Sequence, residues 1–480
     1  MKYKHALFLN PYVRSSAISS MMLFPPTGLE YVATNAKDSV GKITLLDLRY
    51  EKELSVIDNL LDFIAKEIDL VCVGVSWDRQ LKEIFDLLNL IPTGRPLVVG
   101  GYQASEKVEE FFNNCPRIDI IVRGEGEETI KEIAPGARFE DILGISYRAD
   151  GKIIHNSNRP LPDINSIFPP DRSLRRSECR LMLNGINVTN VSFDTVLSSR
   201  GCPYNCKFCT FSLNPLGQKR SYAVRQVELV VDEIEKMTAN AIIFSDENFF
   251  VDVKRAEKIC DLIISRKIKK RFVAQARIEV AQHPKLLDKM VKAGFKTLLI
   301  GIESPHDWIL AQIDKGFDSK AVREAFSVFR KYPLYYHGYF IYGNIGESEE
   351  EMLYIAQFAK EIGVDSFSSQ KLRIEKFSPL KELALNTPGY HVTDRGELYS
   401  DTYSHAALKK IGRRIKFSFY TPSRYLKMLW KGIFVIKFFS FKELLALLFV
   451  TPRILYSVIA REVEKSRLAD TLKRLFIKNV

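Results

Sequence analysis

The feature that most constrains the fold is a repeated alternation of short apolar runs with helical patterns. Five apolar runs of strand length occur in the first part of the chain, at residues 6–9, 43–47, 70–76, 97–101 and 118–122. Between the second and third runs, the apolar residues of segment 56–64 recur at helical spacing. Strands separated by helices form βαβ units, which build a parallel sheet covered on both faces. We therefore predict a Rossmann-like, doubly wound α/β domain over residues 1–140, with its ligand beyond the carboxyl ends of the strands.

A second alternation occupies residues 191–375. Its predicted strands are residues 195–199, 241–245, 271–276, 297–302, 335–342 and 366–372, and helical apolar faces lie between them, for example at 256–264 and 352–362. Six units are fewer than the eight of a closed barrel, so a partial (β/α)6 barrel is predicted, with its chemistry at the carboxyl ends of the strands. Between the two alternations, residues 141–190 contain four prolines that interrupt regular structure, and we interpret them as a connector.

Three of the seven cysteines, Cys202, Cys206 and Cys209, lie within eight residues directly after the first strand of the second alternation. An odd number of cysteines in a chain without a signal-peptide pattern argues against a disulfide framework. A structural zinc site would need a further Cys or His pair, and the remaining cysteines have no partner at such a spacing. Three thiolates at this spacing can instead hold three irons of a 4Fe-4S cluster and leave the fourth iron open.

The pattern Cys-x3-Cys-x2-Cys, with Phe208 before the third cysteine, resembles the signature of the radical S-adenosylmethionine (SAM) superfamily. The resemblance implies a 4Fe-4S cluster whose open iron binds SAM, and reductive cleavage of SAM to a radical that abstracts hydrogen from a substrate. Residues at successive strand ends match family positions near SAM, namely Asp246, Glu247, Asn248, Gln275, Arg277, Glu303, Ile341 and Gly343. The last two belong to a fifth-strand motif that is one residue out of step with the family pattern. Taken singly, polar residues at strand ends are usually caps or turn residues, so it is their recurrence at successive strand ends that supports the match.

The first 140 residues resemble the cobalamin-binding domain that precedes the radical SAM domain in one branch of the superfamily. The matching segments are residues 24–29, 46–49, 73–76, 99–101 and 122–127. The resemblance implies that Ser76, Gly100 and Gly101 cradle the nucleotide tail of cobalamin, because a side chain on the first glycine would push the backbone away from the ligand. Residues 10–14 lack the cobalt-ligating histidine of many cobalamin enzymes, although this branch commonly lacks it too. A Rossmann-like domain retained only for structure therefore remains an open alternative.

Residues 376–480 are predicted to form a basic, helical C-terminal region. From residue 405 onward there are 17 Lys or Arg and 4 Asp or Glu, a balance of +13, which exceeds the +12 of the whole chain. No stretch of about 18 residues lacks a charge, so we expect no membrane-spanning helix. Basic residues interspersed with Phe, Leu and Trp favour a helix at the surface of an anionic bilayer, and a helical cap on the barrel is the alternative. No RNA-binding module is recognisable, so no nucleic-acid partner is expected.

Residues 1–375 resemble the cobalamin-dependent radical SAM enzymes that include hopanoid and other lipid methylases and the anaerobic magnesium-porphyrin ring cyclase, and the C-terminal region is similar to theirs only in general character. This resemblance implies methylation of an unactivated carbon on an apolar, lipid-like substrate, with a reducing electron donor such as flavodoxin or ferredoxin. We expect a cytoplasmic protein in peripheral contact with the inner face of the membrane. Two alternatives remain open: an oxidoreductase, cyclase or carbon–carbon coupling enzyme acting on a lipid or porphyrin-like substrate, and an inactive SAM- or cobalamin-binding sensor. A tRNA methylthiotransferase is less well supported, because no second cysteine set and no RNA-binding domain are visible.

Overall fold

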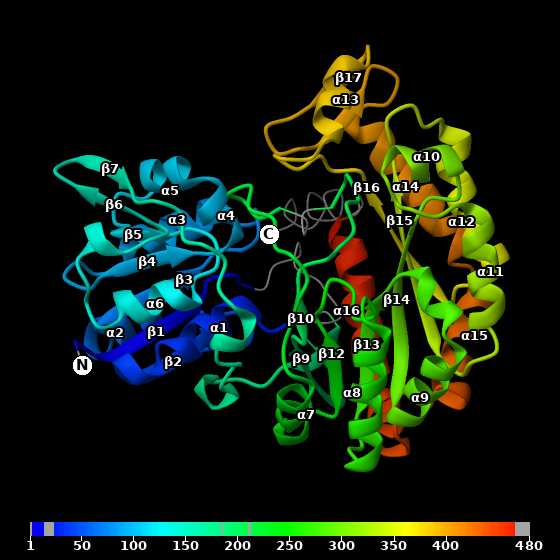
Figure 1. The fold of residues 1–480 in the computed structure, drawn as a ribbon, viewed down its shortest axis with the longest axis horizontal. Coiled ribbons are helices and arrows are strands. Elements are labelled where there is room, and N and C mark those ends of the chain that lie inside the picture. The colour runs from blue at the N-terminus through cyan, green and yellow to red at the C-terminus, as the bar shows by residue number, and fades with distance from the viewer. Residues whose placement is uncertain (1, 14–23, 184–185, 210–212, 466–480) are drawn as a thin grey trace, which may run out of the picture.

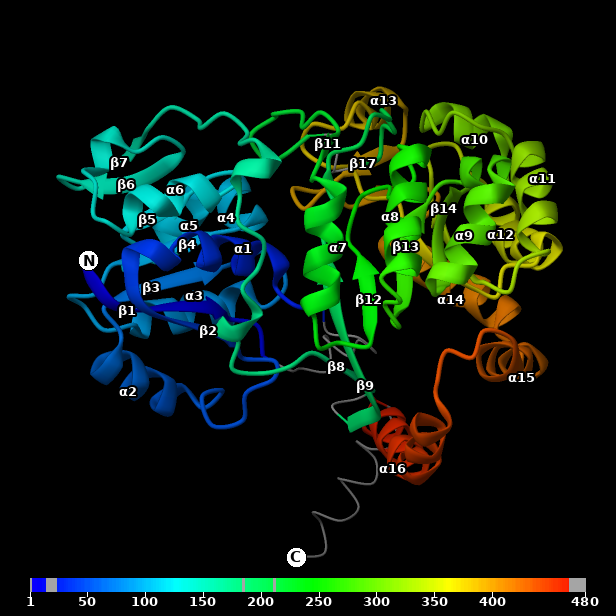
Figure 2. The ribbon, with the colours of Figure 1, turned by 60° about the horizontal axis from the view of Figure 1, so that its bottom comes forward.

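Two seven-stranded β-sheets lie side by side in the molecule, and helices pack against each of them (Figure 1). The computed structural model describes residues 2–13, 24–183, 186–209 and 213–465. We call the elements β1–β7 the first unit and the elements β8–β16 the second unit. The helices that follow β16 run from the top of the second unit to the side shown at the bottom of Figure 2.

The first unit contains a seven-stranded sheet of order β2-β1-β3-β4-β5-β6-β7. Its parallel strands are β1 (Tyr3–Asn10), β2 (Val40–Asp47), β3 (Leu70–Gly74), β4 (Leu97–Gly100) and β5 (Ile120–Val122). The helices of its two faces are α2 (Ile57–Glu67), α3 (Leu81–Leu90) and α5 (Val108–Asn114) against α1 (Thr27–Asn35) and α6 (Glu127–Ile133). Along β1, Leu7 and Leu9 pack in the core that includes α2 and α3, whereas Ala6 and Phe8 pack in the core that includes α1 and α6. Burial on both faces explains the continuous apolar run, and the doubly wound prediction is confirmed.

Two antiparallel strands, β6 (Ile145–Ala149) and β7 (Lys152–His155), extend this sheet beyond β5. They lie inside the segment that we interpreted as a connector, and the four prolines of that segment come after them. Asp150 and Gly151, both with positive φ, form the tight turn between them. The strands are short and β7 is largely exposed, so neither carries the apolar run on which the sequence interpretation depended.

The second unit is a seven-stranded sheet of order β16-β15-β14-β13-β12-β9-β8. Its six parallel strands are β9 (Ile186–Val196), β12 (Ala241–Phe244), β13 (Arg271–Ala276), β14 (Phe295–Glu303), β15 (Tyr335–Tyr342) and β16 (Ser366–Lys371). They form an open half-barrel, which confirms the predicted partial barrel. The first strand, β9, ends at Val196, whereas the sequence analysis placed the first strand at residues 195–199. The earlier part of β9 pairs with the antiparallel edge strand β8 (Arg180–Leu183). The part of β9 before residue 195 mixes Asn, Thr and Val with its apolar residues, so it has no continuous apolar run by which to recognise it.

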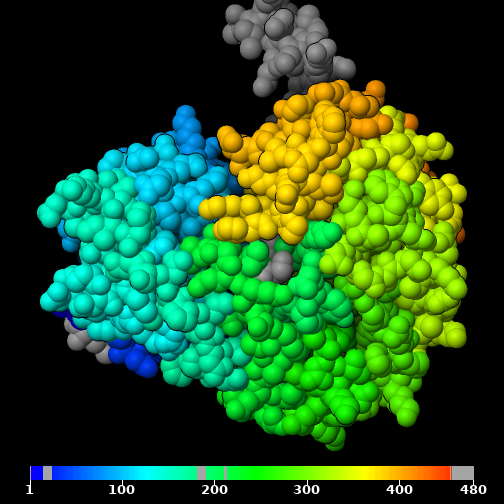
Figure 3. Space-filling view, turned by 45° about the horizontal axis from the view of Figure 1, so that its top comes forward, coloured from blue at the N-terminus to red at the C-terminus, as the bar shows by residue number. Residues whose placement is uncertain are grey.

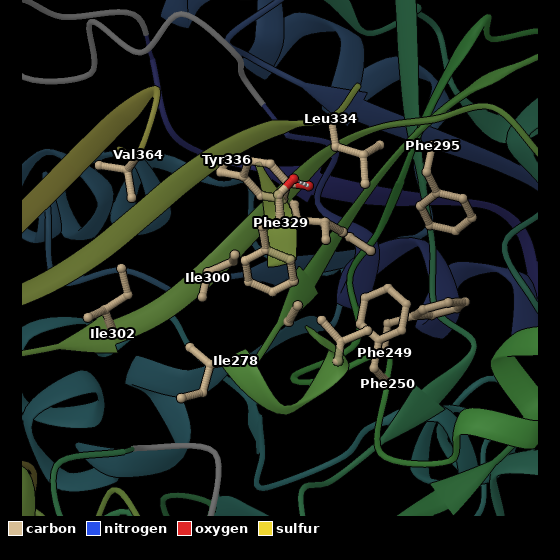
Figure 4. Close-up of a cluster of buried hydrophobic side chains, with 14 of the residues drawn as sticks. Phe249, Phe250, Ile278, Phe295, Ile300, Ile302, Phe329, Leu334, Tyr336 and Val364 are labelled. Carbon is tan, nitrogen blue, oxygen red and sulfur yellow. Dashed lines mark hydrogen bonds between the residues drawn. The ribbon is translucent and has the colours of Figure 1, made fainter. Parts of the chain in front are cut away.

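The helices of the half-barrel pack against one face of its sheet. They are α7 (Val227–Lys236), α8 (Val253–Ser265), α9 (Pro284–Ala293), α11 (Ser319–Phe329) and α12 (Glu349–Ile362). Figure 4 shows part of the resulting core, in which Phe249, Phe295 and Phe329 pack with aliphatic residues of β14. The Tyr336 hydroxyl in this core donates to the carbonyl of Phe329 at 2.8 Å. This rigid core holds the strand ends in fixed positions, and those ends carry the site described below.

The two units are joined by buried ion pairs. Arg175 pairs with Glu30 of α1 at 2.6 Å and with Asp194 of β9 at 2.8 Å. Arg172 adds pairs to Asp194 at 2.7 Å and to Glu233 of α7 at 2.8 Å. Charges buried in this way are stable only while their partners stay in place, so the network fixes how the units sit together.

The C-terminal region is mainly helical, as predicted. Its elements are α13 (Leu380–Asn386), α14 (His405–Phe419), α15 (Pro422–Trp430), the π-helical turn η8 (Lys431–Val435) and α16 (Phe441–Lys465), together with a small hairpin of β17 (Tyr390–Val392) and β18 (Leu398–Ser400). Helix α14 packs on α12, and α16 packs along β9. None of the helices that the structure describes is long and apolar enough to cross a membrane.

Candidate functional site

The loop that carries the three cysteines begins directly after a short strand, β10 (Ser199–Arg200), which pairs with β11 (Ala223–Val224) on the far side of the loop. Gly201 closes the base of the loop with a φ of +82°. A Cβ at this position would lie 2.6 Å from the carbonyl oxygens of both Arg220 and Ser221. Only glycine fits this close approach of two chain segments, which explains the glycine immediately before Cys202.

Two of the cysteines open onto one cavity. Cys206 and Cys209 line a cavity of about 250 Å³ together with Tyr102 of the first unit and Phe377 of the segment after β16. The amide of Cys209 donates to the carbonyl of Cys206 at 3.0 Å, which forms a tight turn between them. Cys202 lies close enough to Cys206 for burial and the charge of Cys206 to raise the pKa of its thiol.

This donor set fits a 4Fe-4S cluster better than a single metal ion. In the described part of the chain, no group of three or more His, Cys, Asp or Glu side chains converges on one point. A cubane cluster gives each cysteine its own iron, so its ligands need not converge. Three thiols on one loop beside an open cavity are therefore a suitable donor set, and Cys202, Cys206 and Cys209 would hold the cluster.

Arg277, at the end of β13, reaches the cysteine loop. One of its Nη atoms lies 3.7 Å from the Sγ of Cys206, and the guanidinium stacks 3.8 Å from the ring centroid of Tyr204. The other Nη donates to the carbonyl of Lys315 at 2.6 Å and to Glu279 at 2.8 Å. A guanidinium beside a thiol favours the thiolate, which is the form that binds iron. The structure thus brings Arg277 to the cysteines and uses its other donors to hold it there.

Glu303 and Phe208 come together through a residue that the sequence analysis missed. Lys315 Nζ lies 2.9 Å from the Glu303 carboxylate in a buried ion pair and 5.7 Å from the ring centroid of Phe208. Glu303 adopts a φ of +72°, and a Cβ on Gly301 would lie 2.6 Å from its Oε1. A non-glycine residue at such a φ indicates a carboxylate held in place by its surroundings.

The three residues at the end of β12 have different surroundings. Asp246 is fully buried and accepts hydrogen bonds from the Ser198 amide at 2.8 Å and from the Ser198 and Ser199 hydroxyls, so it braces the start of the cysteine loop. Asn248 accepts from an amide two residues further on, as a turn residue does. Glu247 lines a second cavity, of about 210 Å³, and burial raises its pKa to about 7. Its Oε2 has no hydrogen-bond partner among the described residues.

The remaining strand-end residues lie nearby. The carbonyl of Gln275 accepts the Phe249 amide at 3.2 Å. Ile341 is buried in a small apolar cluster against which Phe208 packs, and Gly343 has a φ of +73°. The turn that follows Gly343 contains Glu347, whose carboxylate accepts from the Asn344 amide at 2.8 Å. Burial raises the pKa of Glu347 to about 7.

The ligand edge of the first sheet is open at the predicted cradle residues. Gly101 has a φ of +99°, and a Cβ there would lie 2.6 Å from the carbonyl oxygen of Val75. A Cβ on Gly100 would instead make an ordinary contact, 3.6 Å from Val122. Ser76 is exposed. A serine and a backbone without side chains at the carboxyl ends of β3 and β4 fit the nucleotide tail of cobalamin.

The loop after β1, where the sequence lacks a histidine, contains the buried Tyr12. Tyr12 donates its hydroxyl hydrogen to the Trp77 carbonyl at 2.8 Å and accepts from the Trp77 amide at 2.6 Å. Both hydrogen bonds tie the loop after β1 to the loop after β3. This residue therefore shapes the edge, and burial raises the pKa of its hydroxyl to about 12.

The first unit also grips both ends of the cysteine loop, an arrangement that we call the Glu125 clamp. Glu125 accepts from Arg200 at 2.6 Å, just before the loop, and from Arg220 at 2.6 Å, near its end. Glu127 accepts from Arg200 at 2.6 Å. Segment 122–127 was noticed in the sequence, but its partners lie 73 to 95 residues away and could not be foreseen.

The first unit and the cysteine loop meet around Tyr102, the residue after Gly101. Tyr102 lines both the cavity of Cys206 and Cys209 and the cavity of Glu125, Arg200 and Glu247. Figure 3 shows this region, where the cyan, green and amber parts of the surface come together. The ligand edge of the first sheet and the predicted cluster loop are therefore parts of one composite site.

Comparison with known proteins identifies the second unit. Residues 196–359 match the model of the Radical SAM superfamily. An uncharacterized methyltransferase of Pyrococcus horikoshii is 29% identical over 364 residues, which cover 71% of this chain and 74% of the relative. The hopanoid C-3 methylase of Methylococcus capsulatus is 25% identical over 296 residues, which cover 58% of this chain and 53% of the relative.

A solved structure shares the arrangement of both units. The radical SAM methyltransferase TsrM of Kitasatospora setae, determined with cobalamin and a [4Fe-4S] cluster bound, superposes with a TM-score of 0.69 and 16% identity. The match covers 88% of this chain and 90% of TsrM. Residues 196–359 are therefore a radical SAM domain, and the chain is a radical SAM enzyme that uses a 4Fe-4S cluster and SAM.

Proposed function

We propose that this radical SAM enzyme methylates an unactivated carbon of an apolar, lipid-like substrate and uses cobalamin bound at the ligand edge of its first unit. The observation that carries the proposal is the position of Tyr102, which follows Gly100-Gly101 and lines the same cavity as Cys206 and Cys209. A methyl donor at the first sheet would lie next to a substrate radical formed at the second. The methylase names of the relatives support the reaction class.

The bound cofactors would supply reductive cleavage of SAM to a hydrogen-abstracting radical, and a transferable methyl group. The protein would hold the reactants in place and exclude water. Cys202, Cys206 and Cys209 would ligate three irons, and Arg277 would stabilise the thiolate of Cys206. Ser76, Gly100 and Gly101 would position the nucleotide tail of cobalamin through a hydroxyl and bare backbone. The Glu125 clamp would hold the cysteine loop and the cobalamin-binding residues at a fixed position relative to each other.

Around SAM, we propose roles for the remaining strand-end residues. The Glu303–Lys315 pair and Phe208, which contact each other, would form one wall of the SAM site, and Gln275, Ile341 and Gly343 lie at neighbouring strand ends. Glu247 would face the ligand with a carboxyl group whose pKa lies near neutrality. Asp246 and Asn248 would act indirectly, because their oxygens are engaged by the backbone and by serine hydroxyls.

The test begins with protein purified without oxygen, reconstituted with iron and sulfide, and given SAM, a strong reductant and hydroxocobalamin. We expect 5′-deoxyadenosine to form and cobalamin to remain with the protein through gel filtration. A variant with Cys202, Cys206 and Cys209 changed to Ala should lose the brown absorbance of the cluster and the cleavage of SAM. Cys260→Ala, at a buried cysteine of α8, is the matched control and should retain both.

Different outcomes separate the alternatives. If 5′-deoxyadenosine forms without retention of cobalamin, the first unit is structural, cobalamin-dependent methylation is refuted and the oxidoreductase alternative is favoured. A product that has lost hydrogens instead of gaining a methyl group would identify an oxidoreductase or coupling enzyme. Cofactor binding without 5′-deoxyadenosine at any substrate would indicate a sensor. SAM cleavage that persists in the triple cysteine variant would refute the cluster assignment.

The proposal includes two partners. One is a reducing electron donor such as flavodoxin or ferredoxin, which must deliver an electron to the cysteine loop. The other is a membrane surface, where an apolar substrate would be concentrated, and the C-terminal helices are the part of the chain suited to contact it.

A further inference from the structure

We propose that α15, η8 and the first half of α16 form one face that binds the surface of an anionic lipid bilayer. We call it the tail face and define it by six apolar side chains that are 60% to 82% exposed, namely Leu426, Trp430, Phe434, Phe441, Leu448 and Phe449. The face gives a specific location to the membrane contact in the proposed function. Its binding to lipid can be measured without any catalytic activity.

The exposed apolar side chains recur at helical spacing. Leu426, Trp430 and Phe434 are four residues apart along α15 and η8, so they lie on one side of the helix. On α16, Phe441 and Leu448 are seven residues apart, and Phe449 adjoins them. Two consecutive helices thus present an apolar stripe to solvent, which a soluble domain normally buries.

Basic side chains border the same helices. Four basic side chains are exposed, namely Lys427, Lys437, Lys442 and Arg453. None of them forms an ion pair with another residue that the structure describes. The acidic residue of this stretch, Glu443, is buried and paired with Arg271. Apolar anchors flanked by unpaired positive charge match the interface of a bilayer that contains anionic lipid, because the basic side chains are attracted to the negative surface.

The tail face cannot bury itself by folding back, because its helices are anchored to the barrel. Arg271 donates to Glu443 at 2.7 and 2.9 Å, and Lys296 donates to the carbonyl of Ile436 at 2.9 Å. Phe438 and Phe439 pack against the apolar cluster formed by β9, β12 and β13. These contacts hold one side of the segment 436–443 against the barrel, so the apolar stripe on the other side faces solvent.

The position of the face suits a peripheral membrane protein. In Figure 2, α16 lies at the bottom of the molecule and α15 at the lower right, whereas β11, which pairs with the strand before the cysteine loop, lies at the top. A bilayer at the tail face would leave the opening beside Cys206 and Cys209 accessible to a protein electron donor. A second copy of the chain is a poorer occupant, because a symmetric interface would bring the same unpaired lysines together.

The test is flotation of the full-length protein with vesicles of phosphatidylcholine alone or mixed with phosphatidylglycerol. We expect binding to the mixed vesicles, little binding to phosphatidylcholine, and weaker binding at high salt. The variant Trp430→Ser, Phe434→Ser, Phe449→Ser should bind the mixed vesicles at least about tenfold more weakly. The matched control changes three exposed apolar residues elsewhere, Leu90→Ser, Phe168→Ser and Leu385→Ser, and should bind as the unchanged protein does.

Further measurements keep the result interpretable. Circular dichroism must show the same thermal unfolding for both triple variants, and Lys427→Glu with Lys442→Glu provides a second variant that leaves the apolar stripe intact and should also weaken binding. Equal binding by the stripe variant and the control, or no binding to mixed vesicles, would overturn the proposal. So would a dimer in gel filtration that the stripe variant alone abolishes, because the face would then bind a second copy. These outcomes do not depend on SAM cleavage, so they leave the proposed chemistry untouched.

Discussion

Changing Gly101 to Ala should destabilise the first unit strongly, whereas changing its neighbour Gly100 to Ala should not. Gly101 has φ and ψ of 99° and 176°, a region that is essentially restricted to glycine and costs other residues about 1–3 kcal/mol. Its new Cβ would also lie 2.6 Å from the Val75 oxygen and 2.8 Å from the Val75 carbonyl carbon. Forcing a methyl group into a packed position costs a further ~1–3 kcal/mol. The expected loss in free energy of unfolding is therefore about 2–6 kcal/mol.

The matched variant tests a different property of the same loop. A Cβ on Gly100 lies 3.6 Å from Val122, an ordinary contact, so the free energy of unfolding should change by less than about 1 kcal/mol. If the bare backbone of Gly100 contacts cobalamin, Gly100→Ala should nevertheless lose the cofactor in gel filtration. Loss of cobalamin with unchanged stability would thus show that Gly100 is needed for binding the cofactor and not for the conformation of the turn.

Urea unfolding followed by far-UV circular dichroism measures the first effect, and cobalamin absorbance after gel filtration measures the second. A chain with two units can unfold in more than one transition, so the transition that the Gly101 variant shifts is the one to compare. Equal stability of the Gly101 variant and the unchanged protein would refute the steric reasoning. Cobalamin retention by Gly100→Ala would refute the role given to that glycine.

Three further predictions concern the composite site. Glu125→Gln removes the negative charge that Arg200 and Arg220 share, so the free energy of unfolding measured in urea should fall by about 3 kcal/mol. The control Glu110→Gln, at a more exposed ion pair, should change it by less than about 1 kcal/mol, and equal effects of the two variants would contradict the clamp. The pKa of Glu347 is raised to about 7, so the folded protein keeps a proton on this residue that the unfolded chain releases above pH 4.5. The free energy of unfolding should therefore fall by about 3 kcal/mol as the pH rises from 4.5 to 7. Urea unfolding at several pH values should show this decrease in the unchanged protein and not in Glu347→Gln. Arg277→Lys keeps the charge but loses the planar stack and the forked hydrogen bonds, so iron retained after desalting should fall, while the exposed Arg323→Lys should retain iron normally.

The parts of the fold that were predicted from the sequence are those with a local pattern. Strands buried on both faces, such as β1 and β3, consist of continuous apolar residues, and amphipathic helices such as α8 and α12 show their period directly. The strands β6, β7 and β8 are only four or five residues long, so none of them contains an apolar run long enough to stand out in the sequence, and β7 is also largely exposed. They were recognised only from their pairing.

The site divides in the same way. The cysteine spacing and the polar strand ends are local patterns, and they led to Cys202, Cys206, Cys209 and Arg277. Lys315 and Glu125 were missed because their importance comes from partners far away in sequence. Nothing near Lys315 indicates that it will pair with a strained Glu303.

The Glu125 clamp has a consequence for how the enzyme can move. One carboxylate holds both ends of the cysteine loop, and its side chain and those of Arg200 and Arg220 are only 11% to 22% exposed. Swinging the units apart would break both of these ion pairs at once, and their shielding from water makes each of them stronger than a pair on the surface. We therefore expect the spacing between the two units to stay fixed at the cysteine loop. On this basis, substrates would enter and products would leave through openings of the closed molecule, with small rearrangements of loops instead of a hinge.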